Sequence, residues 1–142
     1  ISDAGKTIRV VVGSLYGAKS PVPTVHETIF GDVQLKAGAT VPLEAGHEER
    51  AIYILDGEIE ISGDKFGGGQ LLVFKPGDII SLTATRDSHF VIIGGAPLDG
   101  PRRMNWNFVS SDPQRIDAAR ARWAAADWPQ VPGETSRIEL PR

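Results

Sequence analysis

The side chains that could support catalysis or metal binding in this 142-residue chain gather between residues 38 and 57, in the sequence GATVPLEAGHEERAIYILDG. Glu44, His47 and Arg50 lie in this segment, and His26 precedes it on an expected strand. Two histidines and one carboxylate form a common ligand set for divalent iron, so His26, His47 and Glu44 are one candidate metal site. The spacing of the whole segment points to a different interpretation.

That spacing resembles the first cupin motif: a glycine, five residues, His-x-His, three or four residues, Glu, six residues and a glycine. The ligand positions hold Glu44, Gly46 and Arg50. Glycine offers no side chain, and arginine stays protonated and repels a cation. Residues 69–77 resemble the second cupin motif, but Ile80 stands where its histidine ligand would be. We therefore predict a cupin fold that binds no metal at this position.

Glu44 and Arg50 should point into the mouth of such a fold. One interpretation is a salt bridge between them that closes the vacated site, although desolvation would offset much of the attraction. The alternative is that Arg50 uses its planar fork of donors to bind a carboxylate or phenolate ligand. In that case Glu44, Arg50 and His47 form a ligand pocket. No residue of the chain is assigned a catalytic role.

Each of the three histidines has a structural explanation that competes with ligation. His47 is expected in a solvated loop, with a displaced metal site as the alternative. His26 is expected at a strand edge or interface, and His89 at the surface after a turn. A site made by His26, His47 and Glu44 would depart from the cupin ligand spacing, and we rank it below these interpretations.

Size and composition predict one ordinary globular domain without disulfides. The chain is 41% hydrophobic and has a formal charge of −3, which disfavours nucleic acid as a direct partner. It contains no cysteine, no signal peptide and no apolar run of membrane-spanning length, so we expect a cytoplasmic protein. Its first residue is Ile1 and not methionine, which leads us to expect a piece of a longer protein.

Most of the chain alternates between strand-like segments and turn signals, which predicts an all-β sandwich or barrel. Expected strands cover residues 8–12, 25–36, 50–56, 58–62, 70–74, 78–83 and 89–93. Three of them are apolar on both faces and should need cover on the outside as well as inside. Tyr53 has the opposite parity to Arg50 and is expected to pack outside.

The pattern of strand-like segments ends at residue 95, and an irregular segment that contains Trp106 and Phe108 follows. A helix should follow, with Asp112 as N-cap and Pro113 at its first position, or with Ser111 and Gln114 as a capping box. It should end near Asp127. We expect a degenerate, metal-free cupin barrel over 1–109, a helix over 110–128 packed on the barrel or a partner domain, and an extended tail over 129–142.

The order of these pieces resembles the C-terminal domain of the pirin family, whose members are two-domain cupins. The resemblance covers nearly the whole chain and is closest to bacterial members. The segments that carry it are Val11-Val12-Gly13, Ser20-Pro21-Val22, Asp32-Val33-Gln34-Leu35, Tyr53-Ile54-Leu55-Asp56-Gly57-Glu58, Gly94-Gly95-Ala96-Pro97-Leu98 and Trp106-Asn107-Phe108-Val109-Ser110-Ser111.

The resemblance implies an all-β cupin jelly-roll β-barrel with a C-terminal α-helix and an extended tail. It also implies that iron or another divalent metal is bound by an N-terminal cupin absent from this chain, through three histidines and a glutamate. Bacterial members are associated with quercetin 2,3-dioxygenase activity, and eukaryotic members with transcriptional co-regulation. The expected partner is the missing N-terminal cupin domain. A homodimer of the chain through an uncovered apolar face is a further expectation.

Three function hypotheses follow. The first is the non-catalytic cupin half of a pirin-like protein, whose other half would be a metal-dependent, quercetin 2,3-dioxygenase-like enzyme. The second is a ligand-binding or transcription-regulatory interaction module without enzymatic activity. The third is a metal-free cupin isomerase or epimerase, which needs a His–Asp base and a tyrosine acid inside the barrel. We rank it lowest, because the histidines lie in turns and Tyr53 faces outward.

Overall fold

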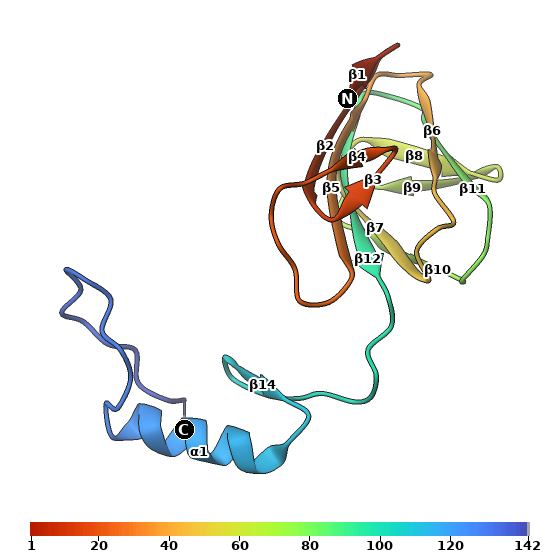
Figure 1. The fold of residues 1–142 in the computed structure, drawn as a ribbon. Helices are drawn as coiled ribbons and strands as arrows, with labels where there is room; N and C mark the ends of the chain where they lie inside the picture. Colours follow the sequence, from red (N-terminus) through yellow and green to blue (C-terminus); the bar gives the residue numbers. More distant parts are fainter. Residues whose placement is uncertain (142) are drawn as a thin grey trace. The chain divides into compact units, whose positions relative to one another are not determined.

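The computed structural model describes residues 1–141 and divides the chain into two compact units, Ile1–Pro97 and a second unit that begins at Leu98. The first unit contains nearly all of the strands (Figure 1). The second unit contains a small hairpin, the helix α1 and the C-terminal tail. The candidate site and the core belong to the first unit.

The larger sheet of the first unit has six antiparallel strands. Its order is β1 (Ser2–Asp3), β2 (Lys6–Val12), β5 (Thr28–Leu35), β12 (Ser88–Gly95), β7 (Glu49–Asp56) and β10 (Leu71–Phe74). The central strands β5, β12 and β7 are each eight residues long and pair along almost their whole length. They form the rigid part of the scaffold.

The smaller sheet has four antiparallel strands in the order β6 (Thr40–Leu43), β11 (Ile80–Ala84), β8 (Glu58–Ile61) and β9 (Asp64–Gly67). A short hairpin of β3 (Ser14–Leu15) and β4 (Ala18–Lys19) forms a separate two-stranded sheet, and its Leu15 is buried in the core. The inward side chains of the two sheets make one core, which includes Ile52, Ile54 and Phe90 from the larger sheet and Ile59 and Leu82 from the smaller. The predicted all-β architecture is confirmed, as two sheets that pack together and are not closed into a barrel by hydrogen bonds.

The outer side of the larger sheet carries apolar side chains that the strand register places side by side. Phe30 pairs with Ile93, Ile93 with Ala51, and Ala51 with Val73. In the next row, Val91 pairs with Tyr53 and Tyr53 with Leu71. We call these residues and Leu55 the outer apolar face. Tyr53 is 37%, Leu55 46%, Leu71 54% and Val73 75% exposed, so the prediction that Tyr53 lies outside is confirmed.

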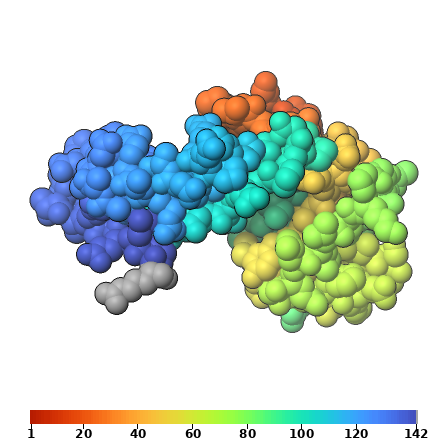
Figure 2. All heavy atoms as spheres, turned by 90° about the horizontal axis from the view of Figure 1, so that it is seen from below, coloured from red at the N-terminus to blue at the C-terminus, as the bar shows by residue number. Residues whose placement is uncertain are grey.

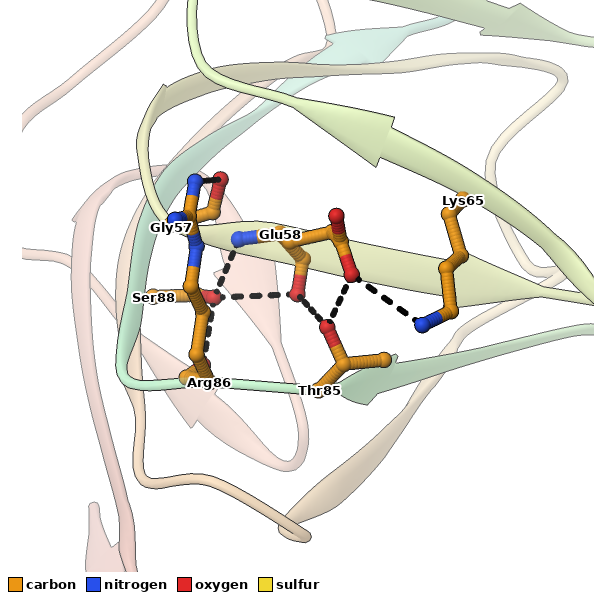
Figure 3. Close-up of polar contacts among 6 residues, drawn as sticks. All are labelled: Gly57, Glu58, Lys65, Thr85, Arg86 and Ser88. Atoms are coloured by element: carbon orange, nitrogen blue, oxygen red, sulfur yellow. Dashed lines mark hydrogen bonds and ion pairs between the residues drawn. The ribbon is translucent and has the colours of Figure 1, made fainter.

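At one end of the first unit, two turns where the chain crosses between the sheets are tied together (Figure 3). One turn connects β7 to β8 and leads to Glu58, and the other connects β11 to β12 and leads to Ser88. The Ser88 hydroxyl accepts from the backbone N–H of Glu58 at 2.9 Å. The Arg86 guanidinium donates to the Gly57 carbonyl at 3.1 Å, and the Thr85 hydroxyl donates to the Glu58 carboxylate at 2.6 Å. A Cβ on Gly57, whose φ is +92°, would lie 2.2 Å from the Ser88 hydroxyl, so only glycine fits here.

The second unit begins with a hairpin, β13 (Arg103–Asn105) and β14 (Phe108–Ser110), which leads into α1 (Pro113–Ala124). Asp112 is the N-cap and accepts from the backbone N–H of Gln114 at 2.9 Å, as predicted, so the alternative capping box does not form. None of the helices in residues 1–141 is both long and apolar enough to cross a membrane.

The helix ends three residues before the predicted Asp127. Ala126 has φ of 59°, and its N–H donates to the Trp123 carbonyl at 3.1 Å while the N–H of Asp127 donates to the Arg122 carbonyl at 2.9 Å. These two bonds form a Schellman motif, which usually has glycine at the left-handed position. A glycine at this position would have indicated the end of the helix in the sequence, but the residue here is Ala126.

Residues 129–141 have no regular secondary structure but are attached to the helix. The indole N–H of Trp123 donates to the Ile138 carbonyl at 2.9 Å, and Arg137 donates to the Trp123 carbonyl. In the space-filling view, the dark-blue atoms of this segment form a continuous body with the lighter blue atoms of the helix (Figure 2). The segment is therefore an extended arm that packs on its own unit.

Candidate functional site

The four positions that correspond to cupin ligands lie at one end of the two-sheet unit. Glu44 follows β6, Gly46 lies in the loop to β7, Arg50 is the second residue of β7, and Ile80 begins β11. Strand pairing brings Arg50 opposite Phe74 on β10, and Ile80 opposite Leu43 on β6. The cupin spacing therefore does assemble the expected location, although its side chains are different.

Arg50 occupies this location and is buried, with only 1% of its surface exposed. Its Nη1 donates to the carbonyls of Asp78 at 2.9 Å, Glu44 at 3.3 Å and Leu43 at 3.5 Å. Its Nη2 donates to the Lys75 carbonyl at 2.7 Å. One guanidinium thus joins the β6–β7 loop to the β10–β11 loop and closes the end of the unit between them.

The predicted salt bridge between Arg50 and Glu44 is wrong. Arg50 contacts the backbone carbonyl of Glu44, whereas the Glu44 carboxylate accepts from the backbone N–H of Tyr16 at 2.7 Å. Loop carbonyls can surround a guanidinium on several sides, which suits its fixed fork of donors. The positive charge also fits that environment, because carbonyl oxygens carry partial negative charge. The vacated site is closed by a cation held among carbonyls and not by an ion pair.

Tyr16 completes this end of the unit and was not anticipated from the sequence. It lies between β3 and β4 with φ of 52°, and its hydroxyl donates to the Pro42 carbonyl at 2.6 Å. Burial, and in second place the Glu44 carboxylate, raises the pKa of Tyr16 well above its ordinary value. The phenol therefore keeps its proton and acts as a hydrogen-bond donor that attaches the β3–β4 hairpin to β6.

His47 was predicted to lie in a solvated loop, but its side chain is mostly buried and is held by hydrogen bonds. Its Nδ1 lies 2.7 Å from a Glu27 carboxylate oxygen, its Nε2 lies 3.1 Å from the Ser14 carbonyl oxygen, and its side chain is 16% exposed. The loop after Gly46 turns His47 back toward the start of β5, where Glu27 supplies an acceptor that the sequence pattern does not reveal. His47 therefore links three segments next to the closed end.

The other histidines are engaged elsewhere. His26 Nε2 donates to the Ala96 carbonyl at 2.9 Å, and His89 Nε2 lies 2.6 Å from an Asp32 carboxylate oxygen on the outer side of the larger sheet. The structure does not assemble His26, His47 and Glu44 into a ligand set. In the described part of the chain, no group of three or more His, Cys, Asp or Glu side chains could hold a metal ion. The donor set at the cupin position does not fit a divalent cation.

Comparison with known families agrees with this geometry. A family model described as the pirin C-terminal cupin domain matches residues 30–129. The chain belongs to the pirin family. It is 38% identical over 123 residues to a pirin-like protein of Caulobacter vibrioides, a match that covers 87% of this chain and 42% of that protein.

A further relative and a solved structure show the same partial coverage. A putative quercetin 2,3-dioxygenase of Pseudomonas aeruginosa is 26% identical over 127 residues, which cover 88% of this chain and 40% of that protein. A crystal structure of quercetin 2,3-dioxygenase from Acinetobacter baumannii matches all of this chain and 49% of its own, with a TM-score of 0.84 and 22% identity.

These matches confirm the predicted cupin jelly-roll fold with its C-terminal helix. The chain spans about two fifths of the length of the curated relatives it matches. It corresponds to the C-terminal cupin half of a pirin-family protein.

Proposed function

We propose that this chain is the non-catalytic cupin half of a pirin-family protein, and that the other half carries a metal-dependent, quercetin 2,3-dioxygenase-like site. The observation that carries the proposal is Arg50, buried at the metal-ligand position with both terminal nitrogens donating to backbone carbonyls. The two loops around it are held closed, which leaves this end of the unit without the open coordination position that metal catalysis requires.

The partner in this proposal is the N-terminal cupin half, and the outer apolar face is where it would dock. Large exposed apolar patches on proteins mark interaction sites. Here Tyr53, Leu71 and Val73 are exposed on neighbouring strands of one sheet, and β10 is an edge strand. A rigid six-stranded sheet with apolar side chains on its outer side is suited to support a second cupin domain.

The test compares the 142-residue chain with the longer protein encoded by its uninterrupted reading frame. Metal content is measured by elemental analysis after purification without chelator, and quercetin oxidation is measured by its absorbance. We expect no stoichiometric metal and no turnover by the chain, and about one metal per longer protein with metal-dependent turnover. Stoichiometric metal on the chain that is lost in Glu44→Ala or His47→Ala would overturn the proposal.

A second candidate function is a ligand-binding or regulatory module that uses the Arg50 end without chemistry. One observation favours it: the Nε–H of Arg50 is buried and is the one buried side-chain polar atom in residues 1–141 without a hydrogen-bond partner. A carboxylate ligand could accept from it. Benzoate titration followed by the Arg50 Nε–H resonance in nitrogen-proton correlation spectra separates the two candidates. The first predicts no saturable shift of that resonance, and the second predicts one.

A further inference from the structure

The second unit contains an aromatic cluster that is separate from the hydrophobic core of the first unit. Trp106, Phe108, Trp123 and Trp128 form one connected cluster, and three of their four edge-to-face pairs have ring centroids 5.2 Å, 5.7 Å and 5.9 Å apart. Phe108 and Trp128 are stacked, with an interplanar angle of 23°. The cluster includes all three tryptophans of the chain, so its tryptophan fluorescence reports on this unit alone.

A pocket of about 640 Å³ lies between this cluster and the C-terminal arm. Its apolar lining comes from Trp106, Trp123 and Trp128 on one side and from Pro129, Val131 and Ile138 on the other. The arm is held there by the hydrogen bond from the Trp123 indole to the Ile138 carbonyl. The pocket is therefore built from one unit, and its walls are mostly ring faces and aliphatic side chains.

Two charged residues line the pocket, and both are already engaged. The Glu134 carboxylate accepts from the Ser136 backbone N–H at 2.7 Å and from the Ser136 hydroxyl at 2.8 Å. The Arg137 guanidinium donates to the Trp123 carbonyl and lies 5.5 Å from the centroid of the Trp123 ring. The two groups carry opposite charges and hydrogen-bond to neutral groups of the unit, so the lining as a whole has no net charge that would favour an ionic ligand.

Four neutral polar residues also line the pocket: Thr135, Ser136, Asn107 and Gln130. The carboxamides of Asn107 and Gln130 make no hydrogen bond within residues 1–141, so each can pair with a hydroxyl of a ligand. Ligand pockets typically combine an apolar and aromatic lining with a small number of such polar groups. The combination fits an uncharged molecule with a flat apolar body and a hydroxyl at its rim.

We propose that the second unit binds a neutral, planar, hydroxylated aromatic compound in this tryptophan-lined pocket. Ring faces favour an aromatic guest over an aliphatic one of equal size, because offset stacking and edge-to-face contacts add to the burial of apolar area. The site uses no residue of the closed end around Arg50 and none of the outer apolar face. The binding proposal can therefore be supported or contradicted independently of the proposed function.

The test uses the 142-residue chain with 2-naphthol as probe and decahydro-2-naphthol as the saturated control of matched size and hydroxyl content. Tryptophan fluorescence is titrated with each compound, and binding is confirmed by calorimetry. We expect saturable one-to-one binding of 2-naphthol with a dissociation constant of the order of 100 µM. The saturated control should bind about tenfold more weakly.

Two matched valine substitutions locate the site. Val131 lines the pocket and is 68% exposed, whereas Val109 lies on β14 in the same unit, is 58% exposed and does not line it. Val131→Ser should raise the dissociation constant about threefold, and Val109→Ser should leave it unchanged. Trp128→Leu, with folding checked by circular dichroism, should weaken binding about tenfold.

Three outcomes would overturn the proposal. One is fluorescence quenching that does not saturate, which is collisional. Another is equal affinity for the aromatic and saturated compounds, which would mean that the pocket recognises apolar surface only. The last is an equal effect of Val131→Ser and Val109→Ser, which would place binding outside the pocket.

Discussion

At the scale of single residues, the candidate site has the spacing of the cupin ligand motif but not its set of donor side chains. Gly46 and Ile80 offer no side-chain ligand, and Arg50 places a buried cationic side chain at this position. Four backbone carbonyls, three of them in loops and one at the end of β6, accept from that side chain. A divalent ion would have linked the strands through side-chain donors, whereas the guanidinium links the loops through backbone acceptors.

Removal of the Arg50 guanidinium should therefore destabilise the chain strongly. Arg50→Ala leaves buried carbonyls without donors and a void in the packing, and we expect a loss of at least about 3 kcal/mol in the free energy of unfolding. Arg50→Lys keeps the charge, but one ammonium group cannot reproduce the fork that spans both loops, so a loss of about 2 kcal/mol is expected. Urea denaturation followed by circular dichroism measures both.

Arg86 provides the control for this prediction. Its single side-chain hydrogen bond runs to the Gly57 carbonyl at the other end of the unit, so Arg86→Ala should cost only about 1 kcal/mol. If Arg50→Ala proved as mild as Arg86→Ala, Arg50 would not close the site in the way inferred.

The Glu58 carboxylate should contribute an acid-dependent part of the stability (Figure 3). The hydrogen bond from the Thr85 hydroxyl is the main cause that holds the pKa of Glu58 below its usual range; desolvation opposes it, and Lys65 and Arg86 add smaller lowering effects. Because the folded state binds this proton more weakly than the unfolded state, the contribution is present above the ordinary glutamate pKa of about 4.3 and is lost as the pH falls through the folded value.

Thr85→Val removes the hydroxyl and keeps the shape of the side chain. The pKa of Glu58 should then rise toward its ordinary value, and stability should fall less steeply below about pH 4. Carbon-13 titration of the Glu58 carboxyl in both proteins measures the change. An unchanged carboxyl titration would show that the Thr85 hydroxyl does not set this pKa.

Residue identity alone could not have revealed the partners of the candidate site. The sequence pattern located Glu44, Arg50 and His47 correctly at one end of the fold, but it paired Glu44 with Arg50 and left His47 in solvent. Both errors have one cause: Tyr16 and Glu27 come from segments far away in sequence, and each supplies the contact that redirects a side chain. Hydrogen-bond partners separated by twenty or more residues follow from the fold and not from local spacing.

At the scale of elements, period and turn signals predicted the seven main strands and the helix, with small shifts at their ends. They missed β6 and β9 of the smaller sheet, and also the strands of two or three residues, which are β1, β3, β4, β13 and β14. Pro42 lies inside β6 and argues against a strand, but β6 is an edge strand, where proline is tolerated. β9 (Asp64–Gly67) has few strand-forming residues and forms because its hairpin with β8 imposes the register.

The end of α1 offers a stabilising substitution. Ala126 occupies the left-handed position of the Schellman motif with φ of 59°, where an alanine side chain is strained and a glycine is not. Ala126→Gly should raise the stability of the second unit by about 1 kcal/mol. The thermal transition followed by tryptophan fluorescence, which reports on this unit alone, measures it.

Ala124→Gly, at the last residue of the same helix, gives a matched control and should destabilise by up to about 1 kcal/mol. Destabilisation by Ala126→Gly would show that Ala126 does not take the left-handed conformation in solution.

At the scale of the whole molecule, the outer apolar face is the feature that the two-sheet fold does not explain by itself. Strands that are apolar on both faces were expected to need cover, and the exposed Tyr53, Leu55, Leu71 and Val73 lie on the side of the sheet away from the core. Strand parity predicted which side chains would lie on the outer face and need to be covered. Composition could not predict which part of the chain, or which partner, covers them.

A chain that keeps this face uncovered should associate with itself through it. We expect a dimer at micromolar concentration by sedimentation velocity, because burial of such a patch removes apolar area from water. Tyr53→Asp and Leu55→Asp should each place a charge in the contact and shift the chain toward monomer. Ile79→Asp is the control, since Ile79 is 94% exposed but lies in the β10–β11 loop, outside this face. A wild-type chain that stays monomeric at every concentration, or an equal effect of Ile79→Asp, would mean that the face does not mediate association.

In a longer protein that contains the N-terminal cupin half, the same two aspartate substitutions should instead loosen the contact between halves, which limited proteolysis would detect as faster cleavage between them.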